Sequence, residues 1–400
     1  MEKGYRMLIV LCRGNIRHID EFTKQLKKVN PLAEISLLTG CEQEKIPQSL
    51  KDNMHEIFIL NPPRQCRIKL RPFSTIVNLY YYLEDYRRLS KNRRYDIVNI
   101  HHAKERYLVY ALCYFRRMAK KIVISPWGGG DVLGLDETKK KQINQIGKLY
   151  RSADRITISP TSNSGKNCIR LFHTDPNKMK PLGWGMEMID HIVENEKLKE
   201  ITIQDAKDRF GVKDRYVIVC GYSTAPSHRH EEIISAVNSK KDQLPSNLTL
   251  LFPLTYGYGS PEYVQKIKNK CAECGLDAKY LTEFMTLDDL YRLRKATDVF
   301  VSMQPVDAGA RSIYEYVLME KKIVLGSWLK GNIYDCTPCF YFPVDNIEDL
   351  GNVIAEACYS DNKEISDEVK MKVLSRGWSN MIKRWDDMFI QLAYENKKSC

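Results

Sequence analysis

Long hydrophobic runs are missing from this chain. In its 400 residues, no apolar run approaches the roughly 18 residues that a membrane-spanning helix needs. The first apolar run, 7–12, stops at Arg13, so it is too short for the hydrophobic region of a signal peptide and is typical of a β-strand. Low-complexity segments and long internal repeats are also lacking. These absences favour a globular, non-repetitive protein.

Clustered cysteines of the kind that form a disulfide framework are lacking too. The twelve cysteines are scattered, and several lie in apolar segments, as Cys12, Cys113, Cys220 and Cys358 do. This distribution is typical of reduced, buried thiols, so we expect a cytoplasmic location. Two C-x-x-C pairs lie much farther apart than the pairs of a structural zinc site, and we expect no metal. The pairs are Cys271/Cys274 and Cys336/Cys339.

The length of the chain and its pattern of apolar segments predict two α/β domains. Four hundred residues exceed one ordinary hydrophobic core. Short apolar strands alternate with polar-faced helices, which is typical of a parallel, doubly wound sheet. The alternation occurs twice, with a join near 183–185. The expected strands are 7–12, 35–39, 57–60, 97–101, 122–125, 156–159, 216–220, 248–253, 280–281, 299–303, 323–325 and 340–344. Helices are expected between them, for example 19–29, 76–90 and 105–119.

Positive charge is concentrated in the first half. Residues 1–188 hold 34 Lys and Arg against 18 Asp and Glu, a net +16, whereas residues 189–400 hold 28 against 32, a net −4. Basic clusters occur at 87–94, 116–121 and 139–141. An anionic membrane, nucleic acid or a phosphorylated substrate fits such a half, and the alternative is that these charges solvate helix ends. RNA-binding patterns are missing, so we expect no nucleic-acid partner and favour docking on the inner face of the cell membrane.

The most informative segment is 301–325, which has the pattern strand, loop, helix, strand. Its small-residue loop opens onto a helix N-terminus, where free backbone N–H groups favour an anion. Asp307 and Glu315 stand eight residues apart, and Glu315 can reach a ribose from the helix. A phosphate site and a hydroxyl site at this spacing suit a nucleoside diphosphate. The donor-binding residues expected here are Gly309, Ala310, Arg311, Ser312 and Glu315.

This segment, with the preceding stretch 284–301, resembles the E-x7-E region of GT-B glycosyltransferases, especially the family-4-like retaining enzymes. The resemblance implies that Glu315 holds the donor ribose and that Asp307 faces the transferred sugar, where the family has a glutamate. It implies two Rossmann-like domains facing a cleft: an acceptor domain, 1–185 with a returning C-terminal helix in 376–400, and a donor domain, 186–375. It also implies metal-independent chemistry, which agrees with the lack of a D-x-D motif.

Residues after the other strands complete the expected site, since ligands of open α/β sheets bind beyond the carboxyl ends of strands. After the first C-terminal strand, Gly221 and Ser223 suit phosphate binding, and Arg229 can grip a diphosphate. Three consecutive glycines after Trp127 suggest close approach of a ligand, although no Gly-Lys-Ser/Thr follows as in a P-loop. The expected acceptor-side residues are Gly14, Asn15, His102, Trp127, Gly128 and Gly129. The expected catalytic residues are Asp307, Asp131 and His101.

The resemblance, together with these residues, therefore implies a glycosyltransferase that uses a nucleotide-diphosphate sugar as its substrate and needs no other cofactor. A lipid-linked or polysaccharide acceptor fits best. The resemblance favours a retaining reaction, whereas an inverting one would need a base such as Asp131 or His101. Two alternatives stay open: a nucleotide-sugar epimerase of the same fold, and a catalytically silent module that binds a partner.

Overall fold

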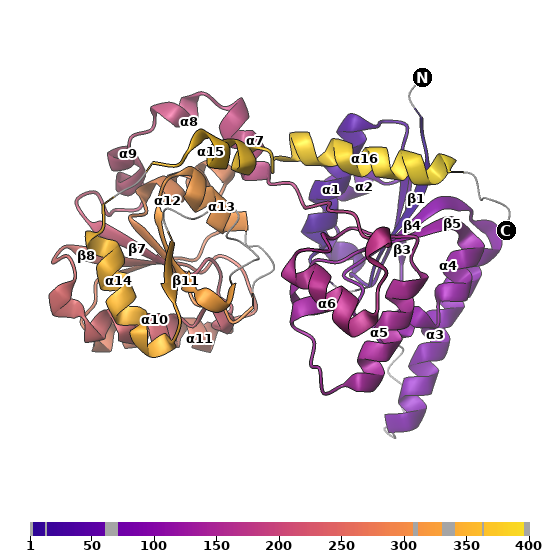
Figure 1. The fold of residues 1–400 in the computed structure, drawn as a ribbon, viewed down its shortest axis with the longest axis horizontal. Helices are drawn as coiled ribbons and strands as arrows, with labels where there is room; N and C mark the ends of the chain where they lie inside the picture. Colours follow the sequence, from indigo (N-terminus) through magenta and orange to yellow (C-terminus); the bar gives the residue numbers. More distant parts are fainter. Residues whose placement is uncertain are drawn as a thin grey trace. The chain divides into compact units, whose positions relative to one another are not determined.

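The chain forms two compact units in a computed structural model that describes residues 3–12, 14–60, 71–306, 311–329, 341–361 and 364–395. Unit 1 combines 1–185 with 378–400, and unit 2 is the continuous segment 186–377. Each unit is built around one sheet with helices on its two faces (Figure 1).

Unit 1 contains a six-stranded parallel sheet in the order β3-β2-β1-β4-β5-β6. Alternate residues of its strands point to opposite faces: Leu8 and Val10 join one buried cluster, and Met7 and Ile9 join the other. A sheet buried on both faces needs such continuously apolar strands. The strands are β1 (Arg6–Leu11), β2 (Glu34–Thr39), β3 (Glu56–Ile59), β4 (Tyr95–His101), β5 (Ala119–Ser125) and β6 (Arg155–Ile156).

Unit 2 repeats this topology with the order β12-β11-β10-β7-β8-β9, again all parallel. Ile218 and Cys220 face one buried cluster, and Val217 and Val219 face the other. In both units the first and fourth strands of the unit lie side by side, so the chain reverses its winding direction between them. The strands are β7 (Tyr216–Cys220), β8 (Leu248–Pro253), β9 (Ala278–Leu281), β10 (Val299–Ser302), β11 (Lys322–Gly326) and β12 (Tyr341–Val344).

The helices follow the strands and cover the sheets. Those of unit 1 are α1 (Ile16–Val29), α2 (Gln48–Asn53), α3 (Arg71–Asn92), α4 (Leu112–Met118), α5 (Lys140–Ser152), α6 (Asn163–Phe172) and α16 (Trp378–Tyr394). Those of unit 2 are α7 (Glu187–Glu194), α8 (Lys197–Glu200), α9 (Ile203–Asp208), α10 (His230–Ser239), α11 (Pro261–Glu273), α12 (Leu287–Ala296), α13 (Arg311–Leu318), α14 (Leu350–Tyr359) and α15 (Asp367–Leu374). Within the described ranges, none of them combines the length and apolarity that crossing a bilayer requires.

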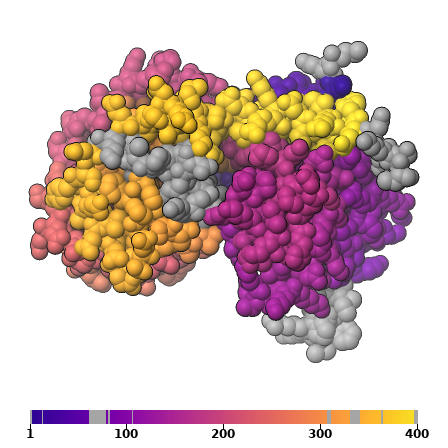
Figure 2. Space-filling model, viewed as in Figure 1, coloured from indigo at the N-terminus to yellow at the C-terminus, as the bar shows by residue number. Residues whose placement is uncertain are grey.

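Helix α16, the last helix of the chain, belongs to unit 1. Its Trp378, Trp385 and Phe389 side chains are fully buried in the cluster that also holds Phe22 of α1. The indole of Trp385 donates a hydrogen bond to the carbonyl of Gly183 (2.9 Å). The opposite side of the helix stays at the surface (Figure 2). The returning C-terminal helix that the family resemblance implied is therefore present.

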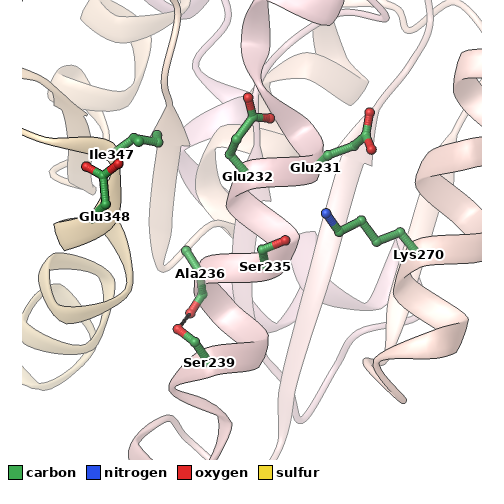
Figure 3. Close-up of a pocket in the computed structure, with 8 residues that line it drawn as sticks. All are labelled: Glu231, Glu232, Ser235, Ala236, Ser239, Lys270, Ile347 and Glu348. Carbon is green, nitrogen blue, oxygen red and sulfur yellow. Dashed lines mark hydrogen bonds between the residues drawn. The ribbon is translucent and has the colours of Figure 1, made fainter.

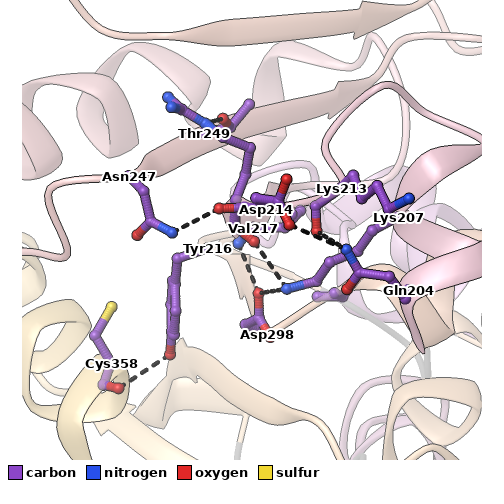
Figure 4. A network of polar contacts seen from close by, with 12 residues as sticks. Gln204, Lys207, Lys213, Asp214, Tyr216, Val217, Asn247, Thr249, Asp298 and Cys358 are labelled. Atoms are coloured by element: carbon purple, nitrogen blue, oxygen red, sulfur yellow. Dashed lines mark hydrogen bonds and ion pairs between the residues drawn. The ribbon is translucent and has the colours of Figure 1, made fainter.

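The amino-terminal edge of the unit 2 sheet is held by a polar network around Asp298 (Figure 4). Its carboxylate accepts from Lys207 Nζ and from the backbone N–H of Val217, both at 2.7 Å. Arg215 extends the network to Asp277 of the β8–β9 connection (2.7 Å). These contacts tie the ends of the strands together at the edge opposite to the loops discussed below.

The predicted fold class is confirmed, because both units are doubly wound α/β domains. Most predicted strands are present with small shifts at their ends, whereas β6 covers only Arg155–Ile156 of the predicted 156–159 region. One helix was predicted wrongly as a continuous element, 105–119. The structure has a 3-10 turn, η2 (Arg106–Val109), followed by α4. Tyr110 and Ala111 between them have ψ values of −20° and −4°, which do not continue α-helical hydrogen bonding.

Candidate functional site

The loops that follow β7, β10 and β11 form the candidate site of unit 2. They lie at the carboxyl ends of adjacent parallel strands, at the point where the winding of the sheet reverses. A cavity of about 300 Å³ opens there. Its lining residues are Arg229, Pro305, Trp328, Asp345, Asn346, Ile347 and Glu348.

The loop after β7 starts with a left-handed glycine, Gly221, at φ +65°. A Cβ atom at this position would lie 2.9 Å from both His228 Cγ and His230 Nε2, so the two imidazoles pack directly on the glycine backbone. Burial lowers the pKa of His228 to about 3, with a further contribution from His230, and burial lowers the pKa of His230 to about 4. Both rings are therefore neutral at physiological pH, and Arg229 is the charged group of this loop.

A buried polar network joins this loop to the next one. His228 Nε2 is 3.0 Å from Ser223 Oγ and 2.9 Å from Gln304 Nε2. The Gln304 side-chain oxygen in turn accepts from the hydroxyl of Tyr222 (3.2 Å). The predicted phosphate-binding residue Ser223 thus supports the loop in this state, and its role toward a ligand stays a prediction.

Arg229 is the predicted residue that lies in the cavity wall. Its backbone is left-handed (φ +56°, ψ +45°), which is uncommon for a residue with a side chain. Its guanidinium lies over the indole of Trp328, 5.7 Å from the ring centroid. A half-exposed guanidinium at the carboxyl ends of a parallel sheet is suited to an anionic ligand.

Two helices begin at this edge, and they differ in the charge of their first turns. The first turn of α10 carries Glu231 and Glu232, which oppose a bound anion. The first turn of α13 carries no acidic residue and begins with Arg311 and Ser312. Ser312 Oγ is buried without a hydrogen-bond partner among the described residues. The α13 start is therefore the better anion site. Asp307, Gly309 and Ala310 precede it and lie outside the described residues.

Glu315 lies one turn into α13 and is buried. Its Oε2 atom accepts a hydrogen bond from Arg294 Nε of α12 (2.9 Å). The same guanidinium donates to the hydroxyl of Tyr316 (3.0 Å) and lies 4.6 Å from the centroid of that ring. Glu315 is therefore fixed in orientation.

A second, open groove of about 500 Å³ runs along α10 and shares Ile347 and Glu348 with the cavity. Figure 3 shows Glu231 and Glu232 on the first turn of α10 and Lys270 approaching from α11. Lys266 of α11 pairs with Glu231 (2.9 Å). No sequence signal pointed to this groove. Among the described residues, no three His, Cys, Asp or Glu side chains group as metal ligands would, and Cys336 and Cys339 lie outside those residues.

In unit 1, the corresponding strand-end loops bring together most of the predicted acceptor-side residues. The indole of Trp127 stacks on the His102 ring (5.0 Å, 26°). Gly14, at φ +145°, lies against the same indole, since a Cβ atom there would be 2.8 Å from it. Asn15, by contrast, is exposed and caps α1 by accepting from the Arg17 backbone N–H (3.1 Å).

The two predicted catalytic residues of unit 1 are both buried. Asp131 accepts from the Trp127 backbone N–H (2.9 Å) across the turn that contains Gly128 and Gly129, and burial raises the pKa of its carboxyl group. His101 is 1% exposed, and burial lowers its pKa to about 3. Its Nε2 atom lies 2.9 Å from Asn99 Nδ2. His102, half-exposed, is the histidine after β4 that a ligand reaches more directly.

Sequence reasoning missed several residues of both sites. In unit 2 these are Gln304, Trp328 and Arg294, and in unit 1 they are His18 and Trp184. Gln304 and Trp328 each stand two residues after a strand end, so the strand-end rule indicated their positions. His18 lies on α1 and touches Trp127 edge-on (5.2 Å) through tertiary packing. No local pattern announces such a contact.

Comparison with known proteins extends the assignment of the fold. No protein-family model matches the chain, and the search of curated proteins gives no significant match. Solved structures match over nearly the whole length. A glycosyltransferase from Rickettsia africae has 15% identity and a TM-score of 0.69, covering 98% of this chain and 100% of its own. HepE from Anabaena, solved in complex with UDP, has 14% identity and a TM-score of 0.69, covering 96% and 99%.

Sucrose-phosphate synthase from Thermosynechococcus elongatus also matches, with 12% identity and a TM-score of 0.67, covering 98% of this chain and 100% of its own. At these identities the likeness defines the fold. The chain has the two-domain GT-B fold of these transferases.

Proposed function

We propose that this protein is a glycosyltransferase that moves a sugar from a nucleotide-diphosphate donor to a glycan or lipid-linked acceptor. The observation that carries the proposal is the position of Arg229 in a cavity at the carboxyl ends of the unit 2 sheet. The fold adds support, because HepE, which shares it, is solved with UDP and with UDP-glucose. UDP is therefore the first nucleotide to test.

In this proposal unit 2 binds the donor. The diphosphate lies at the start of α13, whose first turn carries no acidic residue, and Arg229 neutralises the charge that grows on it as the glycosidic bond breaks. Glu315 accepts from ribose hydroxyls with the oxygen that Arg294 leaves unused. Gly221 and Ser223 shape the loop after β7, and Arg311 and Ser312 form the first turn of α13. Gly309 and Ala310, which precede that helix in the sequence, stay predicted donor-binding residues. Asp307 faces the transferred sugar, as the family resemblance implies.

Unit 1 binds the acceptor at the loops that carry Gly14, His102 and Trp127, with Gly128 and Gly129 forming the turn beside them. A retaining reaction needs no strong base there, because the departing phosphate can accept the acceptor proton. In an inverting reaction Asp131 or His101 would take it, and each must first become accessible, since both are buried. The burial of Asp131 and His101 therefore favours a retaining reaction. Neither course requires a metal if Arg229 and the helix start carry the leaving-group charge.

The decisive experiment combines binding with turnover. Calorimetry with UDP, GDP and dTDP should reveal one preferred nucleotide, and incubation with the matching nucleotide sugars should release it, faster when a glycan or lipid-linked acceptor is present. Interconversion of sugars without release of the nucleotide would instead identify an epimerase. Failure of every nucleotide to bind would identify a silent module.

A further inference from the structure

The indole of Trp328 contacts both the backbone of Gly326 and the guanidinium of Arg229. A Cβ atom on Gly326 would come within 2.2 Å of Trp328 Cε2 and Cζ2, so the ring rests directly on the end of β11. Arg229 lies on the ring 5.7 Å from its centroid. Glycine at 326 is what allows this close approach. Trp328 is therefore held against the end of β11, and it contacts Arg229 while staying partly exposed.

The indole is also fixed in its own plane. Trp328 Nε1 donates to the backbone carbonyl of Gln304 (2.8 Å). The Gln304 side chain contacts His228, which immediately precedes Arg229 in the chain. The contacts thus close a ring that runs from Arg229 to Trp328, to Gln304, to His228 and back to Arg229. Three strand-end loops are joined in it, those after β7, β10 and β11.

Arg229 depends on such support more than most arginines do. It occupies the left-handed backbone region between the 3-10 turn η5 (Pro226–His228) and α10, which disfavours residues other than glycine. Its guanidinium carries no ion pair with a carboxylate of the described residues. The face of an indole is the best aromatic partner for a cation, and it leaves the N–H groups at the rim of the guanidinium available.

We propose that Trp328 is the positioning residue of Arg229. It holds the guanidinium over its ring, at the edge of the cavity, so that the N–H groups can reach an incoming diphosphate. The inference rests on the proposed function, since it assigns to Arg229 the binding of the donor diphosphate. Trp328 itself touches neither phosphate nor sugar. The ring packs on Gly326 and on Arg229, and 37% of the residue stays exposed.

The test compares UDP with uridine on the full-length protein by calorimetry, or the preferred diphosphate with its nucleoside if another nucleotide is bound. Trp328→Leu removes the aromatic face. It should lower the affinity for UDP about tenfold and leave the affinity for uridine unchanged. Trp328→Phe keeps the face and should restore most of the UDP affinity. Tyr359→Leu, which removes an exposed aromatic side chain at the end of α14, is the matched control.

The double variant Trp328→Leu/Arg229→Ala should bind UDP no more weakly than Arg229→Ala alone, because Trp328 acts through Arg229. Additive losses, or equal losses for UDP and uridine in folded Trp328→Leu protein, would overturn the inference and leave the proposed function intact. If the wild-type protein binds no nucleotide of the panel, both are overturned. Thermal unfolding of Trp328→Leu against the wild type identifies any loss that is due to folding alone.

Discussion

Arg294 of α12 and Glu315 of α13 form a buried ion pair, with Nε and Oε2 2.9 Å apart and side chains only 5% and 10% exposed. Arg294 stands 21 residues before Glu315, so the pair joins two helices of unit 2. Burial by itself lowers the pKa of Arg294, but the nearby Tyr316 and Glu315 raise this pKa above its ordinary value. The guanidinium therefore keeps its charge. The carboxylate that the sequence assigns to ribose thus has a structural partner as well.

Replacing Glu315 should therefore affect both stability and nucleotide binding. Glu315→Ala leaves a buried guanidinium unpaired, which should cost about 3–5 kcal/mol of unfolding free energy. The substitution should also weaken the binding of UDP, because hydrogen bonds from ribose to a charged acceptor contribute about 1.5–3 kcal/mol each. Denaturant unfolding measures the first effect, and calorimetry on the folded protein measures the second.

Two further variants separate these effects. Glu315→Gln keeps an acceptor for Arg294 and should lose UDP affinity with a smaller loss of stability. Arg294→Gln breaks the same ion pair without removing the carboxylate, so its folded fraction should bind UDP nearly as the wild type does. Wild-type affinity of Glu315→Gln for every nucleotide would show that Glu315 serves the fold alone.

Arg229→Ala should lower the affinity of the protein for nucleoside diphosphates and leave its affinity for nucleosides unchanged. The guanidinium contributes charge-assisted hydrogen bonds only where phosphate is present, so the loss for UDP should be about 1.5–3 kcal/mol and that for uridine close to zero. Arg209→Ala on the same unit removes an arginine that pairs with Asp289 at the surface and is the control. Similar losses for UDP and uridine in a folded Arg229→Ala protein would assign Arg229 to loop structure.

The sequence predicts the fold closely, since periodicity and strand-end signals are local. Most predicted strands are found with small shifts, and Gly14, His102, Trp127 and Arg229 lie in the loops that follow strands, as expected. The misjudged helix at 105–119 depends on two backbone torsions that side-chain patterns do not encode. The partners of these residues were not predictable either. The contact of Arg229 with Trp328 and that of Glu315 with Arg294 arise from packing between helices and loops far apart in the chain.

Acid should destabilise unit 2 through His228. The pKa of His228 is about 3 in the folded state and about 6.5 in an unfolded chain. Between these pH values His228 is therefore protonated in the unfolded state and neutral in the folded state. The stabilising contribution is complete above pH 6.5 and falls as the pH drops toward 3. Between pH 7 and pH 5 it should decline by about 2 kcal/mol.

Denaturant unfolding at the two pH values measures this decline. It should be smaller by that amount in His228→Gln than in the wild type, whereas His55→Gln, at an exposed position, should change it little. An identical decline in wild type and His228→Gln would mean that His228 takes up its proton in the folded protein as well.

Docking of the basic half on an anionic membrane remains a prediction. The structure reduces the number of basic residues whose charge is not already paired. Several cluster members pair with carboxylates: Arg87 with Glu84, Arg93 with Glu56, Arg116 with Asp154, Lys120 with Asp96 and Lys121 with Glu395. Since each basic residue near such a surface contributes about 1 kcal/mol, we expect reversible, salt-sensitive binding to anionic vesicles. Liposome co-sedimentation at low and high salt measures it.

Neutralising Arg93, Arg94, Arg116 and Arg117 together should abolish that binding. Neutralising Lys266, Lys268, Lys270 and Lys279 of unit 2 removes the same charge and should not. Equal recovery of the wild type in the supernatant with anionic and neutral vesicles at low salt would count against docking and favour a soluble glycan acceptor.

The membership of α16 in unit 1 has a consequence for the order of events during synthesis. Unit 2 is one uninterrupted segment, 186–377, so all of its strands are synthesised before the last helix is. The hydrophobic core of unit 1 is completed only after α16 is synthesised, because Trp378, Trp385 and Phe389 complete the cluster that holds Phe22. The domain that is translated first is thus the one completed last, and until then its α1 face exposes apolar surface to solvent.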